Sequence, residues 1–136
     1  MTIGTNWVAH HGGFAEGIEV WAVATQEDDF MPNVNVLTQA IGDMTLEDYS
    51  ALSLRNAPLL IADFRLLESR TARGPDGSLL AVLDFTGTGV GRRLHFLAVW
   101  TVRDGRAIVA TLTTPVGSFD RIRATIEPYL LTLAAS

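Results

Sequence analysis

The chain has 136 residues, of which 48% are hydrophobic and 18% charged, and its formal net charge is −5 at pH 7. This balance is typical of a packed globular protein and not of a disordered chain. Cysteine and lysine are both missing, which excludes disulfides, cysteine nucleophiles, cysteine-ligated zinc, iron–sulfur clusters and lysine Schiff bases. The acidic charge also argues against nucleic acids and anionic membranes as partners, because both are bound through clustered cations.

The length predicts a single domain over residues 1–136, with an irregular lead-in over residues 1–16, where Gly12-Gly13 interrupts any regular element. The N-terminus shows no basic segment followed by an apolar one. No run approaches the roughly 18 apolar residues that a membrane span needs. We therefore expect a cytoplasmic protein with no membrane segment.

Two strands are predicted before the first helix. Residues 17–25 and 33–40 alternate apolar and polar side chains with the period of two that strands have. Residues 26–29 between them contain Glu27, Asp28 and Asp29, and predict a solvated acidic turn, because neither their spacing nor their glycines match a calcium-binding loop.

A helix is predicted after this pair. Thr45-Leu-Glu-Asp48 is a capping box that starts it. Pro58 lacks an N–H and disfavours helical backbone at Ala57, so we expect the helix to end at Ala57. One helical face carries an apolar stripe together with two polar side chains: Leu46, Tyr49, Leu52, Leu60, Ser53 and Asn56.

Four strands follow, over residues 63–73, 79–86, 92–103 and 106–114. The glycine-rich segment 87–91 is expected to be a flexible loop. It is not a phosphate loop, because it leads into a strand and not into a helix. Asp104-Gly105 is typical of a two-residue type I′ turn, which predicts that Arg103 pairs with Arg106 and that both face solvent.

A last helix is predicted from Ser118, with an apolar stripe of period 3.6 and a kink or restart at Pro128. The strand over residues 92–103 is apolar on both faces, so it needs cover on both sides. The order of elements therefore predicts an α+β fold, an α/β/α sandwich whose mostly antiparallel sheet is covered by helices on both faces.

Asp84 and His95 are the one carboxylate–imidazole pair that can meet inside the sheet. If Thr86 pairs with Arg92, the two side chains lie on opposite faces; if Thr86 pairs with Arg93, they lie opposite each other on one face. The sequence leaves this choice open. A buried and satisfied polar pair is favoured over a catalytic dyad, because no serine or threonine is placed beside it as a nucleophile.

The remaining candidate residues are explained by ordinary structural roles. His10-His11 lacks a third ligand nearby, so no metal site is predicted, and neither a cofactor nor a catalytic residue is assigned. Arginines stand at both ends of the central hairpin and are the candidate contacts for a partner's carboxylates: Arg92, Arg93, Arg103 and Arg106. Trp100 is expected in the core.

Several motifs together resemble one family. They are Phe30-Met-Pro-Asn-Val-Asn-Val36, Leu46-Glu-Asp-Tyr49, Leu97-Ala-Val-Trp-Thr-Val102, Asp104-Gly-Arg-Ala107, Val109-Ala-Thr-Leu-Thr113 and Phe119-Asp120. Over residues 17–134 the chain resembles the bacterial DcrB-like and LpqN-like proteins, which belong to the superfamily of plant PsbP and the Ran-binding Mog proteins. The family's Pro-x-Gly-Trp strand is missing, and only Trp7 corresponds to part of it. The lipobox cysteine of the lipoprotein members is also missing.

The resemblance implies a PsbP-like sandwich and a binding or accessory role, without shared catalytic residues. We therefore expect a non-catalytic cytoplasmic accessory protein, such as an effector chaperone or a scaffold subunit, with a protein partner or a second copy of itself. The alternative is a small-ligand-binding protein or enzyme, with a pocket between sheet and helix that uses Asp84 and His95.

Overall fold

A computed structural model describes residues 7–9, 13–15, 18–24 and 32–135 of the chain. The strands are β1 (Trp7–Ala9), β2 (Gly13–Ala15), β3 (Ile18–Ala24), β4 (Asn33–Ala40), β5 (Ala62–Arg73), β6 (Leu79–Gly89), β7 (Arg92–Arg103) and β8 (Arg106–Pro115). The helices are α1 (Leu46–Leu60), the short 3₁₀ helix η1 (Val116–Ser118) and α2 (Phe119–Ala135).

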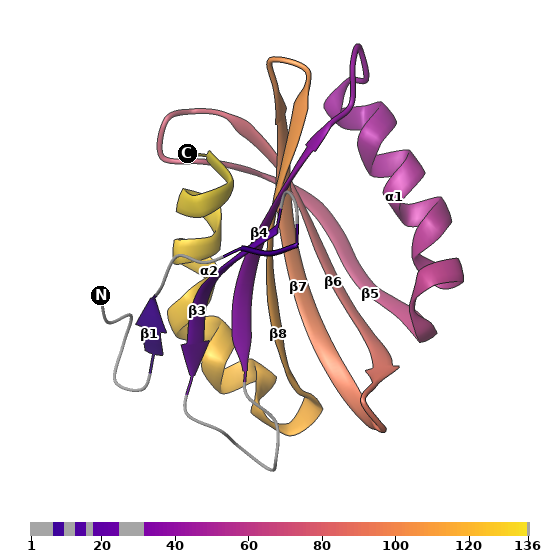
Figure 1. Cartoon of the computed structure of the whole chain (residues 1–136), viewed down its shortest axis with the longest axis vertical. Coiled ribbons are helices and arrows are strands. Elements are labelled where there is room, and N and C mark those ends of the chain that lie inside the picture. The colour runs from indigo at the N-terminus through magenta and orange to yellow at the C-terminus, as the bar shows by residue number, and fades with distance from the viewer. Residues whose placement is uncertain (1–6, 10–12, 16–17, 25–31, 136) are drawn as a thin grey trace.

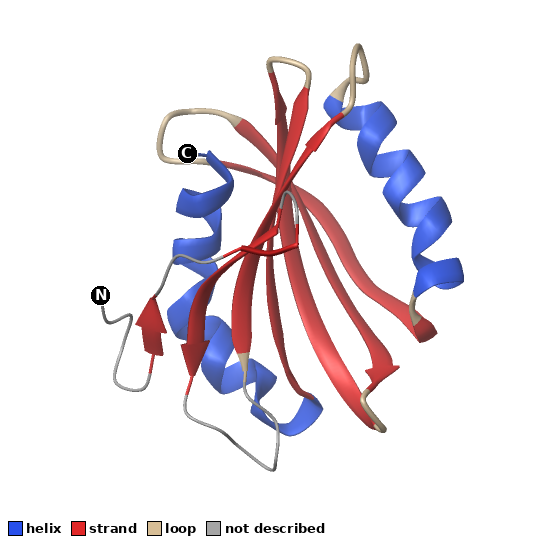
Figure 2. Cartoon of the chain, viewed as in Figure 1, coloured by secondary structure: helices blue, strands red, loops and turns tan. Residues whose placement is uncertain are grey.

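Every strand pairing is antiparallel. Five strands run side by side in the order β4–β8–β7–β6–β5, and β3 extends the sheet beyond β4, followed by β1. In Figure 2 these strands form one strongly twisted sheet with α1 and α2 beside it. The fold is therefore α+β, with the antiparallel sheet that the strand patterns predict.

The strands contribute to two clusters of buried residues, because successive side chains point to opposite faces. Val82, Leu97 and Val99 belong to the first cluster, in which Phe119 and Ile126 of α2 are buried. Side chains that alternate with these belong to the second cluster, in which α1 contributes buried Tyr49 and half-buried partners: Ala81, Leu83, Phe85, Ala98 and Trp100. Trp100 is only 4% exposed, so its expected place in the core is confirmed.

The hairpin of β7 and β8 has the predicted register. Arg103 pairs with Arg106, Trp100 with Val109 and Phe96 with Thr113. The turn residues Asp104 and Gly105 have φ angles of 53° and 74°. Both values lie in the left-handed region that a type I′ turn requires, which is why the Asp-Gly pair predicts the register correctly.

The glycines of segment 87–91 predict a flexible loop, and this prediction is wrong. β6 runs on to Gly89, which pairs with Arg92, so the connection is a tight turn of Val90 and Gly91. Both residues have positive φ, 46° and 77°. Gly87 is a strand residue with a packing role, because the side chain of Ile61 lies where a β-carbon would be at position 87.

The first helix starts as predicted and ends later. Thr45 accepts a hydrogen bond from the Asp48 N–H at 3.1 Å, and the Asp48 carboxylate accepts one from the Thr45 N–H at 3.3 Å. The expected end at Ala57 is wrong, because the helix continues through Pro58 to Leu60. The Ile61 N–H donates to the carbonyl of Ala57 at 2.9 Å. This bond holds the last turn although proline supplies no donor.

The ends of the chain also differ from expectation. The lead-in contains the two short strands β1 and β2, which pair with β3. Residues 10, 11 and 26–29, which include the histidine pair and the acidic turn, lie outside the described residues. At the other end, α2 starts at Phe119, directly after η1, and continues across Pro128 without a restart.

Candidate functional site

Asp84 on β6 and His95 on β7 lie on the same face of the sheet. The register pairs Thr86 with His95 and Asp84 with Leu97, which is neither of the two alternatives left open by the sequence. Asp84 is therefore the diagonal neighbour of His95, and Asp84 Oδ1 lies 2.5 Å from His95 Nε2. The pair meets because the two-residue turn at Val90 and Gly91 sets this register.

A third partner comes from α2. Arg123 Nη1 donates to Asp84 Oδ2 at 3.0 Å, and Arg123 Nη2 donates to Glu127 Oε1 at 3.1 Å. The same Glu127 oxygen accepts from Arg70 of the edge strand β5 at 2.6 Å. Both carboxylate oxygens of Asp84 thus have hydrogen-bond partners. This network of side-chain contacts connects β6 and β7 with α2 and β5.

The surroundings of Arg123 favour its charge. Burial opposes that charge, but the hydrogen bond and carboxylate of Glu127, together with the charges of Asp84 and Glu68, hold the pKa of Arg123 above its ordinary value. The ring of Phe119 stacks on His95 with centroids 3.3 Å apart. Arg123 also lies over the Phe119 ring, 5.7 Å from its centroid. These contacts make the cluster a structural link between sheet and helix.

The four hairpin arginines do not form one surface. Arg92 and Arg93 begin β7 and Arg103 ends it, so the two groups lie on the order of 30 Å apart at the usual rise of an extended strand. Arg93 donates to Thr86 at 3.1 Å. Arg103 donates to Asp76 Oδ2 at 3.0 Å, in the turn between β5 and β6. A role of these residues in partner binding stays a prediction.

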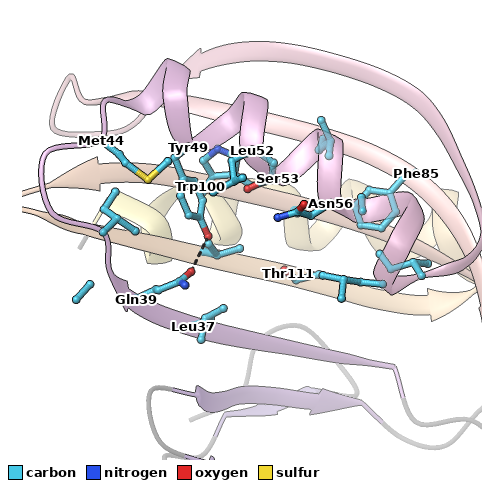
Figure 3. Close-up of a pocket in the computed structure, with 18 residues that line it drawn as sticks. Leu37, Gln39, Met44, Tyr49, Leu52, Ser53, Asn56, Phe85, Trp100 and Thr111 are labelled. Carbon is cyan, nitrogen blue, oxygen red and sulfur yellow. Dashed lines mark hydrogen bonds between the residues drawn. The ribbon is translucent and has the colours of Figure 1, made fainter.

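A hollow lies between α1 and the sheet. It is a cavity of about 560 Å³, within the roughly 300–1,000 Å³ that is common for ligand sites. Its sheet side includes Leu83, Phe85 and Trp100. Residues on the predicted stripe of α1 form its other wall, and Figure 3 shows them pointing from the helix toward the sheet: Tyr49, Leu52, Ser53 and Asn56.

The cavity lining carries no charge. None of its 18 residues is Asp, Glu, Arg or His. At one end the Tyr49 hydroxyl donates to Gln39 Oε1 at 3.3 Å (Figure 3). Burial raises the pKa of Tyr49, against a smaller lowering by a hydrogen bond with Ser53. The cavity is therefore an apolar compartment with a few neutral polar groups.

Asp84 and His95 do not line this cavity. Asp84 lies between Leu83 and Phe85 on β6, and both of these face the cavity, so Asp84 points to the opposite face of the sheet. The expected combination of these two residues with a pocket is therefore not the arrangement found. The alternative drawn from the sequence placed a pocket between sheet and helix but did not identify the residues that line it, for which Ser53 and Asn56 on an otherwise apolar stripe were the available signal.

No group of three or more His, Cys, Asp or Glu side chains that could hold a metal ion occurs within residues 32–135 and the described strands before them. Neither α1 nor α2 combines the length and the apolar character that crossing a membrane requires. What the fold and the site define is thus an α+β protein with an uncharged cavity under a helix.

Solved structures share this fold. A Pseudomonas aeruginosa protein of unknown function, PA94, described as a putative regulator, is 22% identical, with a TM-score of 0.75 over 85% of this chain and 81% of that one. Cyanobacterial PsbP (CyanoP) of Synechocystis is 23% identical, with a TM-score of 0.54 over 96% and 80% of the two chains. A STAR-related lipid transfer protein of Xanthomonas axonopodis is 13% identical, with a TM-score of 0.50 over 96% and 98%.

These likenesses show the fold, with a PsbP-like protein among its structural neighbours. No family model matches the sequence, and no curated protein matches it either.

Proposed function

We propose that this chain is a non-catalytic accessory protein of the DcrB-like and LpqN-like type, built as a PsbP-like α/β/α sandwich. It acts in the cytoplasm as an effector chaperone or a scaffold subunit. The cavity beneath α1 is the place where it binds and shields an apolar part of its partner. The observation that carries this proposal is the uncharged lining of a cavity of about 560 Å³.

The distribution of ionisable groups supports a binding role over catalysis. Most enzymes place a carboxylate, an imidazole or another charged side chain in the pocket as the general acid or base, and the lining of this cavity holds none. Here the one buried carboxylate–imidazole pair is Asp84 with His95 among the described residues, and it lies on the sheet face opposite the cavity. Both Asp84 oxygens are already engaged by His95 and Arg123.

The exposed apolar residues beside the cavity also support this function. Leu59 and Leu60 at the end of α1 are 80% and 82% exposed, and Leu60 lines the cavity. A large apolar side chain that is exposed at the edge of an apolar cavity, as Leu60 is, is typical of a binding site.

The test is a matched pair of alanine-to-phenylalanine variants on α1. Ala57 lines the cavity, whereas Ala51 is exposed. The chain and both variants are purified from their native cells, and co-purifying molecules are identified by mass spectrometry. We expect a partner that is retained by wild type and by Ala51→Phe and is lost from Ala57→Phe. Equal retention by both variants, or no retained partner at all, would contradict the proposal.

A folding control accompanies this pair. Circular dichroism and thermal unfolding establish that each variant is folded. Ser53→Leu, which also adds apolar volume to the cavity wall, replaces Ala57→Phe if the larger side chain prevents folding.

A further inference from the structure

Two polar side chains in the cavity have no hydrogen-bond partner among the described residues. The Asn56 amide and the Thr111 hydroxyl make no hydrogen bond with any residue that the structure describes. Both residues are half-buried. In Figure 3 the Asn56 side chain points from α1 toward the sheet, and Thr111 lies on the sheet side of the same space. An amide carries two donors and two acceptor lone pairs, so a molecule in the cavity finds a neutral hydrogen-bonding group there.

The size of the cavity restricts its occupant. An α-helix with its side chains is about 10 Å across and rises 5.4 Å per turn, so one turn occupies about 400 Å³. The cavity of about 560 Å³ therefore holds little more than one turn. A flexible single hydrocarbon chain fits a space of this volume without displacing α1.

The lining restricts the charge of the occupant. An ionised headgroup placed beside Asn56 would lose its hydration and meet no opposite charge, because all 18 lining residues are uncharged. A neutral headgroup loses far less hydration free energy than an ionised one, and it gains the hydrogen bonds that Asn56 and Thr111 offer.

We propose that the cavity binds an uncharged single-chain amphiphile, such as a monoacylglycerol, with its chain along the apolar lining and its polar group at Asn56 and Thr111. This inference concerns the same cavity as the proposed function and goes beyond it, since it gives the cavity a lipid as its occupant in place of an apolar part of a partner protein. Leu60 lines the cavity and is 82% exposed at the end of α1, so this end is where the chain enters.

The experiment compares two ligands of one chain length on delipidated protein. N-phenyl-1-naphthylamine, a neutral apolar dye, is bound first, and monomyristoylglycerol or myristate is titrated to displace it at about pH 8, where the free carboxylate is ionised. We expect monomyristoylglycerol to displace the dye at a concentration at least about tenfold lower than myristate. Equal potency, or preference for myristate, would overturn the assignment of a neutral ligand.

Variants test the two polar groups. Asn56→Leu and Thr111→Val remove the hydrogen-bonding groups with small changes of volume. Each is expected to lower the affinity for monomyristoylglycerol about fivefold. Thr125→Val makes the same change at an exposed position of α2 and should have no effect. The dye's own affinity is measured in each variant, so that a distorted cavity is recognised. Unchanged glyceride affinity in both cavity variants would contradict the inference.

The outcomes also separate this inference from the proposed function. If the dye binds but an apolar helical peptide displaces it more strongly than the glyceride does, the lipid inference fails and a protein-binding cavity stands. If neither dye, lipid nor peptide binds, both proposals fail.

Discussion

The carboxylate of Asp84 lies 2.5 Å from the imidazole of His95 on the neighbouring strand, diagonally across the sheet. The side chain of Asp84 is 10% exposed and also accepts a hydrogen bond from Arg123 of α2. One carboxylate therefore links two strands to the helix that follows them.

Removing this carboxylate should destabilise the protein strongly. In Asp84→Ala the charge of Arg123, whose side chain is 25% exposed, loses its most buried partner. We expect the free energy of unfolding to fall by about 3 kcal/mol, as for other broken buried ion pairs. Chemical denaturation measures the change. Glu68→Ala is the control, because its side chain is 51% exposed, and it should cost less than about 1 kcal/mol.

A methyl group at position 87 should destabilise the contact between β6 and the end of α1. The Ile61 side chain occupies the space of a β-carbon at Gly87, so Gly87→Ala forces a local shift that we expect to cost about 1–3 kcal/mol. The double variant Gly87→Ala with Ile61→Ala should be less destabilised than the sum of the two single variants in a double-mutant cycle, because the shortened side chain at position 61 makes room for the added methyl group. Gly117→Ala, where nothing lies within 4 Å of the added carbon, is the control. Additive effects would contradict this explanation.

The turn between β6 and β7 contains a strained residue. Val90 has a φ of 46° and is 83% exposed, so a β-branched side chain occupies left-handed backbone without gaining burial. Val90→Asn should raise the free energy of unfolding by about 1 kcal/mol, because asparagine tolerates this conformation. Val90→Ala should raise the free energy of unfolding much less, since alanine still carries a β-carbon. If both variants gain equally, backbone strain is not the cause.

Acid should weaken the turn between β5 and β6. Two hydrogen bonds from Ser78, from its N–H and its hydroxyl, together with the charge of Arg103, hold the pKa of Asp76 below its ordinary value of 3.8. The charged carboxylate therefore contributes stability that is present above pH 3.8 and is lost as the pH falls through the lower pKa of the folded state.

The measurement is denaturation of wild type and Asp76→Asn over a pH series. The difference in unfolding free energy between them should be constant near neutral pH and should shrink below about pH 4. A difference that does not change with pH would show that the charge of Asp76 contributes nothing to stability.

Much of the sheet could be predicted because its signals are local. Asp104-Gly105 restricts the β7–β8 turn to two residues, and that restriction alone sets the register of the hairpin. The turn at Val90-Gly91 has the same geometry, but valine gives no such signal, and the surrounding glycines allow a loop or a bulge equally well. For this reason the sequence could not decide how Asp84 meets His95.

The candidate sites likewise have one part that the sequence could predict and another that it could not. The positions of Ser53 and Asn56 on the inner stripe of α1 follow from the helical period, and both do line the cavity. The volume of that cavity depends on how far α1 stands from the sheet, which no periodicity reports. Glu127 and Arg123 could not be assigned to Asp84 either, because the docking of α2 brings together segments that are distant in the sequence.

The sequence by itself determined the class of fold, the strand and helix faces, and the chemistries that missing cysteine and lysine exclude. These follow from side-chain period, capping and turn residues, which act over a few residues. Only the tertiary structure decided that the ionised cluster and the neutral cavity lie on opposite faces. The physical reason is that strand register and helix docking depend on packing between distant segments, and a shift of one residue reverses the face of every side chain on a strand.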